Sequence, residues 1–303
     1  MRRSERRSRL LWAGGKHVLA PWLLVLLPLL VYLAILAYPL LASIVLSFTE
    51  WSGLGQGPSF VGFRNYVELF SRGTILHAVR NNLTWLILSV PVPAVVGFIL
   101  AYWLREQNRR NTILRSCFYL PMILSNAVLA LIWMNVYDPR HGLLREILTF
   151  LHLPAPVRSF LTRPGTAIVA IAVAGIWHWI GFPLVIYLAA IQDIPKQLLE
   201  AAELDGASRF QQLRHIVIPL VGHATIIVVA LGAILSMKVF DLIYLLTGGY
   251  YKNDVVGTLI WRIAFEQFKL GKASAVAVVQ FLIIAVMVIP YVLLARRQSE
   301  VEL

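Results

Sequence analysis

Long apolar runs alternate with short polar stretches along almost the whole chain. Six of the runs approach or exceed the length needed to cross a membrane, about 20 mostly apolar residues. They cover about 18–48, 83–104, 113–137, 167–191, 221–246 and 274–294. The polar stretches between them contain no long hydrophilic domain and no internal repeat. The pattern predicts an all-α, polytopic membrane protein with six transmembrane helices, spanning residues 18–297 between short terminal segments.

The two ends of the chain predict its orientation. Residues 1–17 carry six basic side chains against one acid, Glu5, and such segments stay on the cytoplasmic side. The apolar run that follows is too long for a signal-peptide core. An even number of spans returns the C-terminal tail, 298–303, to the same side, so both termini are expected to be cytoplasmic. The short second loop contains the basic residues Arg105, Arg109, Arg110 and Arg115, as expected of a cytoplasmic loop. The outer loops also contain basic residues.

Composition narrows the class of protein. Only 14% of the residues are charged and 59% are hydrophobic, whereas soluble domains carry about a quarter charged residues. The formal net charge of +12 would suggest nucleic acid as the partner of a soluble protein. Here the basic residues lie between apolar runs, so we expect contact with membrane lipid and no nucleic-acid partner.

The sequence contains no recognisable catalytic, metal or cofactor motif. Cys117 is the only cysteine, so the chain cannot form an internal disulfide or a thiolate metal cluster. The seven histidines show no metal-ligand spacing and are expected to be loop or interface residues. The closest approach to a phosphate-binding loop, 271–274, lacks both the hydroxyl residue after Lys272 and the first glycine. We therefore expect no metal, no bound cofactor and no enzyme activity in this chain.

The most informative polar stretch lies at about 193–219, before the fifth span. Pro195 at a first helical position starts a helix, and Asp205-Gly206 ends it by allowing a left-handed residue. A second helical segment is then expected to end before Pro219. Leu198, Ala201, Ala202 and Asp205 share one face of the first helix, where the alanines allow close approach of another protein, and Glu200 and Glu203 add charge. A solvated connector and a docking element fit this pattern equally well.

The stretch resembles the EAA loop of binding-protein-dependent ABC importer permeases. The family pattern is Glu-Ala-Ala, three residues, Gly, nine residues, Ile, one residue, Leu, Pro, and this chain has isoleucine at the leucine position. The matching residues are Glu200, Ala201, Ala202, Gly206, Ile216 and Pro219. The resemblance covers about 18–297 and is nearest to carbohydrate-type permeases of the maltose and glycerol-phosphate importers. Segments that carry it include Tyr38-Pro39, Phe60-Val61-Gly62, Leu120-Pro121 and Phe240-Asp241-Leu242.

This resemblance implies a type I importer permease that forms half of a channel. It implies that the loop, including Asp205, docks on a cytoplasmic ATPase present in two copies, which binds ATP in place of this chain. It also implies a second, different permease subunit and an extracytoplasmic binding protein that delivers a sugar. The chain is thus expected in the prokaryotic inner membrane as a translocating subunit.

Candidate substrate contacts follow from polar groups inside the spans, which are costly unless functional. The expected cavity residues are Lys238, Asp241, Tyr244, Asn126, Trp133 and Trp177, with Trp179 as a further candidate. For Lys238 and Asp241, an alternative is a structural ion pair at i, i+3 of a continuous helix. For the tryptophans, the alternative is packing or a place at the membrane interface.

Two rival functions remain for comparison. A secondary transporter would need intramembrane carboxylates or histidines and usually an internal repeat, and only Asp241 lies inside a span. A non-transporting scaffold would leave the EAA loop without a purpose. Separately, the aromatics at 60–70 predict a short helix on the outer membrane surface, with contact to a protein partner as the alternative.

Overall fold

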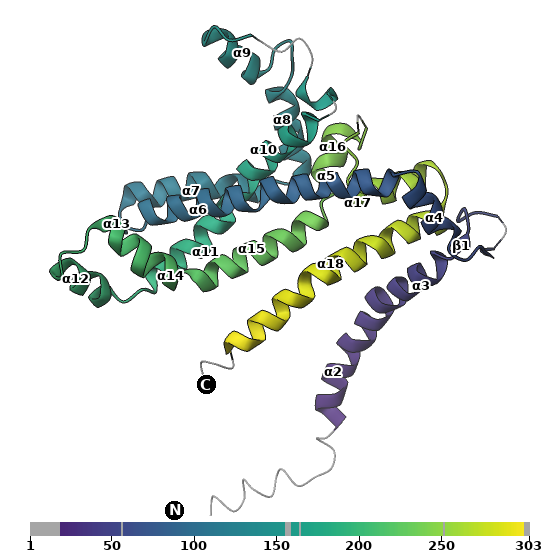
Figure 1. Cartoon of the computed structure of the whole chain (residues 1–303), viewed down its shortest axis with the longest axis horizontal. Helices are drawn as coiled ribbons and strands as arrows, with labels where there is room; N and C mark the ends of the chain where they lie inside the picture. Colours follow the sequence, from purple (N-terminus) through teal and green to yellow (C-terminus); the bar gives the residue numbers. More distant parts are fainter. Residues whose placement is uncertain (1–18, 56, 155–158, 164, 251, 300–303) are drawn as a thin grey trace, which may run out of the picture.

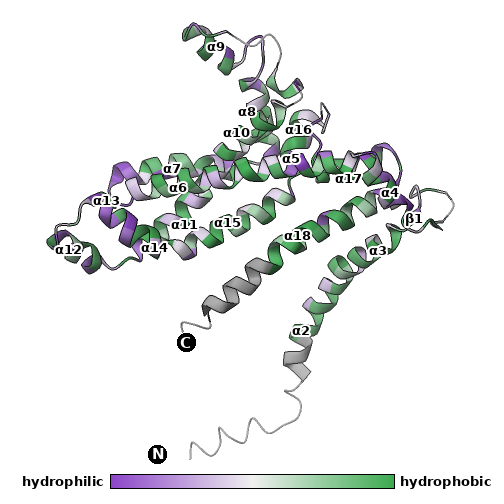
Figure 2. Ribbon diagram, viewed as in Figure 1, coloured by the Kyte–Doolittle hydropathy of each residue, from purple (hydrophilic) through white to green (hydrophobic). Residues whose placement is uncertain are grey.

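The computed structural model describes residues 19–55, 57–154, 159–163, 165–250 and 252–299. The predicted cytoplasmic segment 1–17 and residues 300–303 of the predicted tail lie outside the described residues. The described part is an elongated bundle of helices, with α8 and α9 standing away from one side and two long helices diverging on the other (Figure 1). The apolar surface of the helices and the polar ends of the bundle are visible in Figure 2.

The chain forms helices with only two very short strands among the residues described. The first half contains α2 (Leu19–Tyr32), a π-helix (Leu33–Ala37), α3 (Tyr38–Leu46), β1 (Thr49–Glu50), β2 (Ser59–Phe60), α4 (Arg64–Ser71), α5 (Thr74–Ser89), α6 (Pro91–Trp103), α7 (Arg109–Ile123), α8 (Asn126–Val136) and α9 (Leu143–Phe150). The second half contains a 3-10 helix (Phe160–Thr162), α10 (Ala167–Trp179), α11 (Gly181–Gln192), α12 (Lys196–Leu204), α13 (Arg209–Gln212), a π-helix (Leu213–Val217), α14 (Ile218–Leu220), α15 (Gly222–Met237), α16 (Asp241–Thr247), α17 (Val256–Trp261), a π-helix (Arg262–Glu266) and α18 (Leu270–Ser299). The two strands pair antiparallel, Thr49 with Phe60 and Glu50 with Ser59.

Six candidate membrane spans are found among the described residues if each bent helix pair counts as one. Three are continuous stretches, 24–46, 74–103 and 270–289, and three are pairs, 109–136, 167–192 and 209–237, bent by 102°, 40° and 60°. The all-α, six-span prediction is therefore confirmed in this form. The structure corrects the expected boundaries, because the second span begins at Thr74 and the fifth does not run as one helix over 221–246.

Close helix packing depends on small residues that let backbones approach. A Cβ on Gly97 of α6 would lie 2.6 Å from Cβ of Pro183 in α11, and a Cβ on Gly175 of α10 would lie 2.6 Å from the ring of Trp85. Around these contacts three apolar clusters form. They centre on Trp85, Ile171 and Ile243, on Ala101, Tyr187 and Val228, and on Leu69, Leu259 and Val276.

The first span stands apart from the bundle. No residue of α3 is buried, and α2 runs away from the other helices (Figure 1). Its exposed side chains are almost all apolar (Figure 2), so this span presents its surface to lipid or to another subunit. The end of α3 packs against α18, which is the last span.

Candidate functional site

The fifth span expected from the sequence, 221–246, is broken between α15 and α16. Phe240 has φ −144° and ψ −62°, so the helix does not continue through 238–240. The carbonyls at the end of α15 instead accept from side chains on other helices. Asn82 Nδ2 donates to the Ser236 carbonyl at 3.2 Å, and Gln280 Nε2 donates to the Met237 carbonyl at 2.7 Å. Non-helical backbone at membrane depth is tolerated where it is buried in protein or lines a water-filled cavity.

The third span is broken between α7 and α8. Leu124 has ψ 140°, and Ser125 begins the next helix by accepting the Val128 N–H at 3.4 Å. His178, near the end of α10, places Nε2 3.2 Å from the Leu124 carbonyl oxygen. A carbonyl oxygen only accepts, so Nε2 carries the proton. The histidine therefore ties the fourth span to the break in the third.

The breaks of these spans meet at one cavity of about 270 Å³. Within it, Asn126 Nδ2 donates to Asp241 Oδ2 at 3.0 Å. The Lys238 side chain also lines the cavity, and among the described residues no hydrogen bond or ion pair reaches its ammonium. The cavity is lined by Trp85, Ser89, Asn126, Gly175, His178, Trp179, Gly232, Leu235, Ser236, Lys238, Val239, Phe240, Asp241 and Leu242. Ligand sites usually measure about 300–1,000 Å³, so this cavity lies just below that range.

The structure brings together some of the expected substrate residues and separates others. Asn126, Lys238 and Asp241 share the cavity, and Tyr244 lies beside it, stacked on Phe240 with ring centroids 5.1 Å apart. The structural ion pair given as the alternative for Lys238 and Asp241 is not formed in the described residues, because the helix is unwound between them and Asp241 accepts a hydrogen bond from Asn126.

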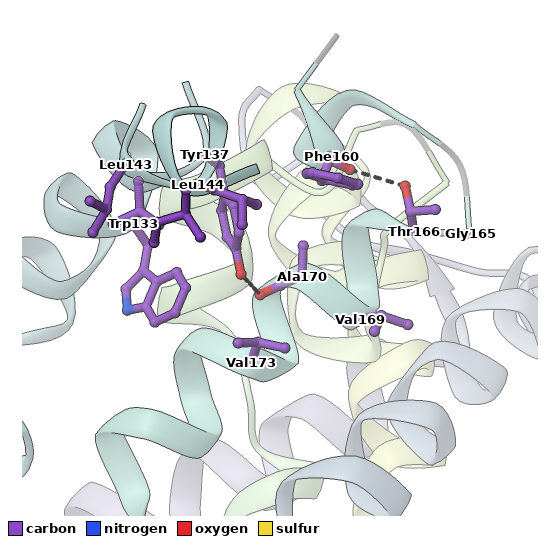
Figure 3. Close-up of a pocket in the computed structure, with 12 residues that line it drawn as sticks. Trp133, Tyr137, Leu143, Leu144, Phe160, Gly165, Thr166, Val169, Ala170 and Val173 are labelled. Carbon is purple, nitrogen blue, oxygen red and sulfur yellow. Dashed lines mark hydrogen bonds between the residues drawn. The ribbon is translucent and has the colours of Figure 1, made fainter. Parts of the chain in front are cut away.

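Trp133 and Trp177 lie outside this cavity lining, whereas Trp179 belongs to it. The two outlying rings pack edge-on with centroids 6.0 Å apart. Trp133 faces a second, outer pocket of about 580 Å³ between α8, α9 and α10 (Figure 3). There the Tyr137 hydroxyl donates to the Ala170 carbonyl at 2.8 Å. Since that hydroxyl is already used and most of the lining is apolar, this pocket suits hydrocarbon better than a polyhydroxy solute.

Sequence reasoning missed the role of small polar residues in the cavity. The Ser89 and Ser236 hydroxyls lie 3.0 Å apart and both side chains are buried. His178, expected to be a loop or interface residue, lines the same cavity. The available signal was polar residues at positions 89, 178 and 236 inside otherwise apolar runs, which is a sign of function in a membrane span.

A second candidate site is the coupling segment, which we define as 193–219. Helix α12 begins at Lys196, one residue later than expected, with Pro195 as its N-cap. Gly206 has φ +81°, and the backbone forms two closing hydrogen bonds. The Gly206 N–H bonds the Glu203 carbonyl at 3.0 Å and the Ala207 N–H bonds the Ala202 carbonyl at 2.9 Å. This is the Schellman pattern, and the left-handed residue it needs is favoured as glycine.

The second half of the coupling segment starts with a capping box. Ser208 Oγ accepts the Gln211 N–H at 3.3 Å, while the Gln211 side chain accepts the Ser208 N–H at 2.7 Å. The helix was expected to end before Pro219. It instead continues through the π-helix 213–217 and α14 to Leu220, so Pro219 lies inside the helix, directly after the π-helical turn.

The coupling segment presents an uncovered surface. No residue of α12 is buried, while Leu204 is 90% and Phe210 68% exposed. Glu200, Ala201 and Asp205 are exposed, Ala202 and Ile216 are half-buried, and Pro219 is exposed. Glu203 lies in the last turn of α12, where a negative charge opposes the helix dipole. An acid that does not stabilise its own helix, beside exposed apolar side chains, is typical of a docking face.

Known proteins resemble this chain over most of its length. The family model "Binding-protein-dependent transport system inner membrane component" matches residues 70–300. The osmoprotective compounds uptake permease protein GgtC of Synechocystis is 34% identical over 282 residues, covering 91% of this chain and 99% of that protein. The trehalose/maltose transport system permease protein MalF of Thermococcus litoralis is 30% identical over 277 residues, covering 90% and 92%.

A solved structure shares the whole architecture. In the crystal structure of a bacterial alginate ABC transporter in complex with alginate pentasaccharide-bound periplasmic protein, the matching chain has 25% sequence identity and a TM-score of 0.80, with coverage of 94% of this chain and 97% of that one. The broken spans, the exposed segment before the fifth span and these similarities lead to one assignment. The chain belongs to the family of inner-membrane components of binding-protein-dependent transport systems, the permeases of ABC importers.

Proposed function

We propose that this chain is one of two different permease subunits of an ATP-driven sugar importer, and that the cavity at the broken spans holds the sugar in transit. The observation that carries the proposal is the Asn126–Asp241 hydrogen bond in a cavity that Lys238 also lines. Hydroxyl-rich solutes are recognised by a few such polar groups in an otherwise apolar site. Indole rings such as Trp179 supply a face for stacking.

The choice of a sugar draws on the relatives. One is named for trehalose and maltose, and a structural neighbour was solved with an alginate oligosaccharide on its periplasmic protein. By analogy, an extracytoplasmic binding protein delivers a sugar to the outer face of this chain. The second permease supplies the other wall of the cavity, which agrees with the small volume enclosed by one chain.

In this proposal, the coupling segment docks on a cytoplasmic ATPase, and two copies of that ATPase drive transport. Its exposed acids Glu200, Glu203 and Asp205 are suited to basic groups on the ATPase, and Leu204 and Phe210 to an apolar groove. The Schellman turn and the capping box make the segment a rigid lever. ATP is bound and hydrolysed by that partner, and the permease itself uses no cofactor.

The orientation follows from the basic residues around the coupling segment. A groove at this end of the bundle is lined by Arg105 of the loop after α6 and by Arg209 of α13. Arg109 and Arg110 begin α7 at the same end. Basic loops remain in the cytoplasm, which supports a cytoplasmic location for this end and for both chain termini.

Co-purification tests the proposal. The chain is expressed with the products of its neighbouring genes and isolated in mild detergent, and the recovered proteins are identified. We expect an ABC ATPase and a second permease at fixed stoichiometry. Recovery of a stable monomer or homodimer without an ATPase overturns the assignment and favours a secondary transporter.

A further inference from the structure

A stripe of largely exposed apolar side chains begins just before the short helix α4 and continues along it. We call Phe60, Phe63, Val67 and Phe70 the outer stripe. These side chains are 80%, 69%, 64% and 48% exposed. The opposite side of α4 is buried through Asn65 and Leu69. The helix is therefore apolar on its outward side as well as on its packed side.

The packed side of α4 is joined to the ends of two membrane spans. Asn65 Nδ2 donates to the carbonyls of Ser47 and Thr49, both at 2.9 Å, just beyond the end of α3. The Tyr66 hydroxyl donates to Ser47 Oγ at 2.7 Å. At the start of α18, Lys272 Nζ donates to Glu68 Oε2 at 3.0 Å. These contacts hold α4 within one side-chain length of the points where the first span ends and the last begins (Figure 1).

The outer stripe continues the exposed apolar surface of the first span. Val45 in the last turn of α3 is 66% exposed. Phe48 follows that helix and packs edge-on against Phe63, with ring centroids 5.2 Å apart. An apolar path thus leads from the membrane span directly to the stripe. Aromatic side chains at this depth are characteristic of the boundary between acyl chains and headgroups.

The flank of α4 beside the stripe is polar. Successive residues of a helix are rotated by about 100°, so Arg64 and Ser71 point away from their neighbours Phe63 and Phe70. The Arg64 guanidinium forms two ion pairs, with 3.5 Å from Nη1 to Glu50 Oε2 and 3.3 Å from Nε to Glu68 Oε1. All three side chains are partly or fully exposed. A helix with one apolar and one charged outward side is suited to lie in the plane of the interface.

We propose that α4 and Phe60 form an interfacial anchor whose outer stripe is immersed in the outer-leaflet lipid of the bilayer. The anchor fixes the junction of the first and last spans at the membrane surface. The proposal needs only that the chain spans a membrane, and is independent of the solute transported. It assigns this exposed apolar surface to lipid and not to docking of the binding protein.

Paired spin labels test this anchor in the assembled transporter in nanodiscs. In a Cys117→Ser background, single cysteines replace the neighbours Phe63 and Arg64 in one pair of variants, and Phe70 and Ser71 in another. The accessibility of each nitroxide is measured to oxygen, which partitions into lipid, and to a water-soluble nickel chelate. Retained subunit stoichiometry and ATPase activity show that each variant is assembled.

We expect the ratio of oxygen to nickel accessibility to be higher at Phe63→Cys than at Arg64→Cys, and higher at Phe70→Cys than at Ser71→Cys. Equal ratios within both pairs would mean that the stripe faces water and would overturn the proposal. Shielding of Phe63→Cys and Phe70→Cys from both reagents on addition of substrate-loaded binding protein would also overturn it, by assigning the stripe to protein docking.

Discussion

The carboxylate of Asp241 accepts a hydrogen bond from the side-chain amide of Asn126, with 3.0 Å between the two atoms. Each residue is the first of its helix, α16 and α8. The bond therefore joins the break in the fifth span to the break in the third, across the cavity proposed for the sugar.

Loss of the charge on Asp241 is expected to impair transport without disturbing assembly. Asp241→Asn keeps the size of the side chain but removes a charge-assisted hydrogen bond, which typically contributes about 1.5–3 kcal/mol. We expect reduced sugar uptake in proteoliposomes and unchanged recovery of the ATPase. Glu146→Gln on exposed α9 is the matched control and is expected to transport normally. Uptake by Asp241→Asn equal to the wild type would leave the residue only a structural role.

Substitutions of Gly206 are expected to uncouple transport in a graded order. The position has φ +81° and open space where a Cβ would lie, so backbone conformation alone limits substitution. Proline fixes φ near −65° and removes the N–H, so Gly206→Pro is expected to abolish uptake. Gly206→Ala costs about 1–2 kcal/mol, and Gly206→Asn less. ATP-driven uptake measures the series, with Gly222→Ala as a neutral control; normal uptake by Gly206→Pro contradicts the lever.

Charge reversal on α12 is expected to weaken the ATPase contact. Glu200 and Glu203 are exposed, so lysine at either position should leave the fold intact. We expect Glu200→Lys and Glu203→Lys to reduce co-purification of the ATPase, more strongly at low salt, where charge interactions are less screened. Glu146→Lys at the opposite end is the control. Undiminished recovery of the ATPase from both α12 variants would argue against docking through this face.

Removal of the Asn82 side chain is expected to destabilise the broken fifth span. Its amide donates to the Ser236 carbonyl at 3.2 Å and its Oδ1 accepts the Val256 N–H at 2.8 Å. Asn82→Leu leaves the buried Val256 N–H unpaired and removes one of the donors to the Ser236 carbonyl. An unpaired buried group costs about 1–3 kcal/mol. Thermal unfolding in detergent measures the loss, and Thr84→Val, on the same helix, is the control. An unchanged melting temperature would mean that the backbone groups at the break find other hydrogen-bond partners.

The ion pair between Glu68 of α4 and Lys272 of the last span, here called the clamp, is expected to weaken only in acid. Lys272, and to a lesser extent Arg64, hold the pKa of Glu68 below its ordinary value. A lowered pKa means that the pair stabilises the folded state above the ordinary pKa of glutamate, about 4.3, and that this stabilisation is lost as the pH falls through the lowered pKa. The mobility of a spin label on Ser71→Cys, in a Cys117→Ser background, follows the clamp. In Lys272→Met the pair is absent, so the label should already be more mobile at neutral pH and change little in acid; the same pH dependence in both proteins would contradict the assigned pair.

Much of this architecture can be predicted from the sequence because apolar runs of sufficient length have few alternatives. The coupling segment is also readable, since Gly206, Ser208 and Gln211 determine a turn and a cap through local hydrogen bonds. The breaks at Leu124 and at Lys238–Phe240 are different. Both lie within continuous apolar runs, and their carbonyls are satisfied by the remote residues His178, Asn82 and Gln280, which no local pattern identifies.

The candidate cavity shows the same limit. Charged residues inside a span indicated Lys238 and Asp241, because such groups are rare there. The alternative of an i, i+3 ion pair assumed a regular helix, which the structure does not have between Lys238 and Asp241. Trp133 and Trp177 were named for their stacking faces, but they lie outside the lining of this cavity. Only the three-dimensional arrangement places Asn126 of the third span against Asp241 of the fifth.

The central claim is that this permease moves a sugar through the cavity at its broken spans, driven by an ATPase on the coupling segment. Its most direct test is uptake of a labelled oligosaccharide by proteoliposomes that contain this chain, its partner permease, the ATPase and the binding protein. We predict accumulation that requires ATP and the binding protein and that is lost in Gly206→Pro and reduced in Asp241→Asn. Accumulation driven by an ion gradient without ATP, or unaffected by both substitutions, would contradict the account.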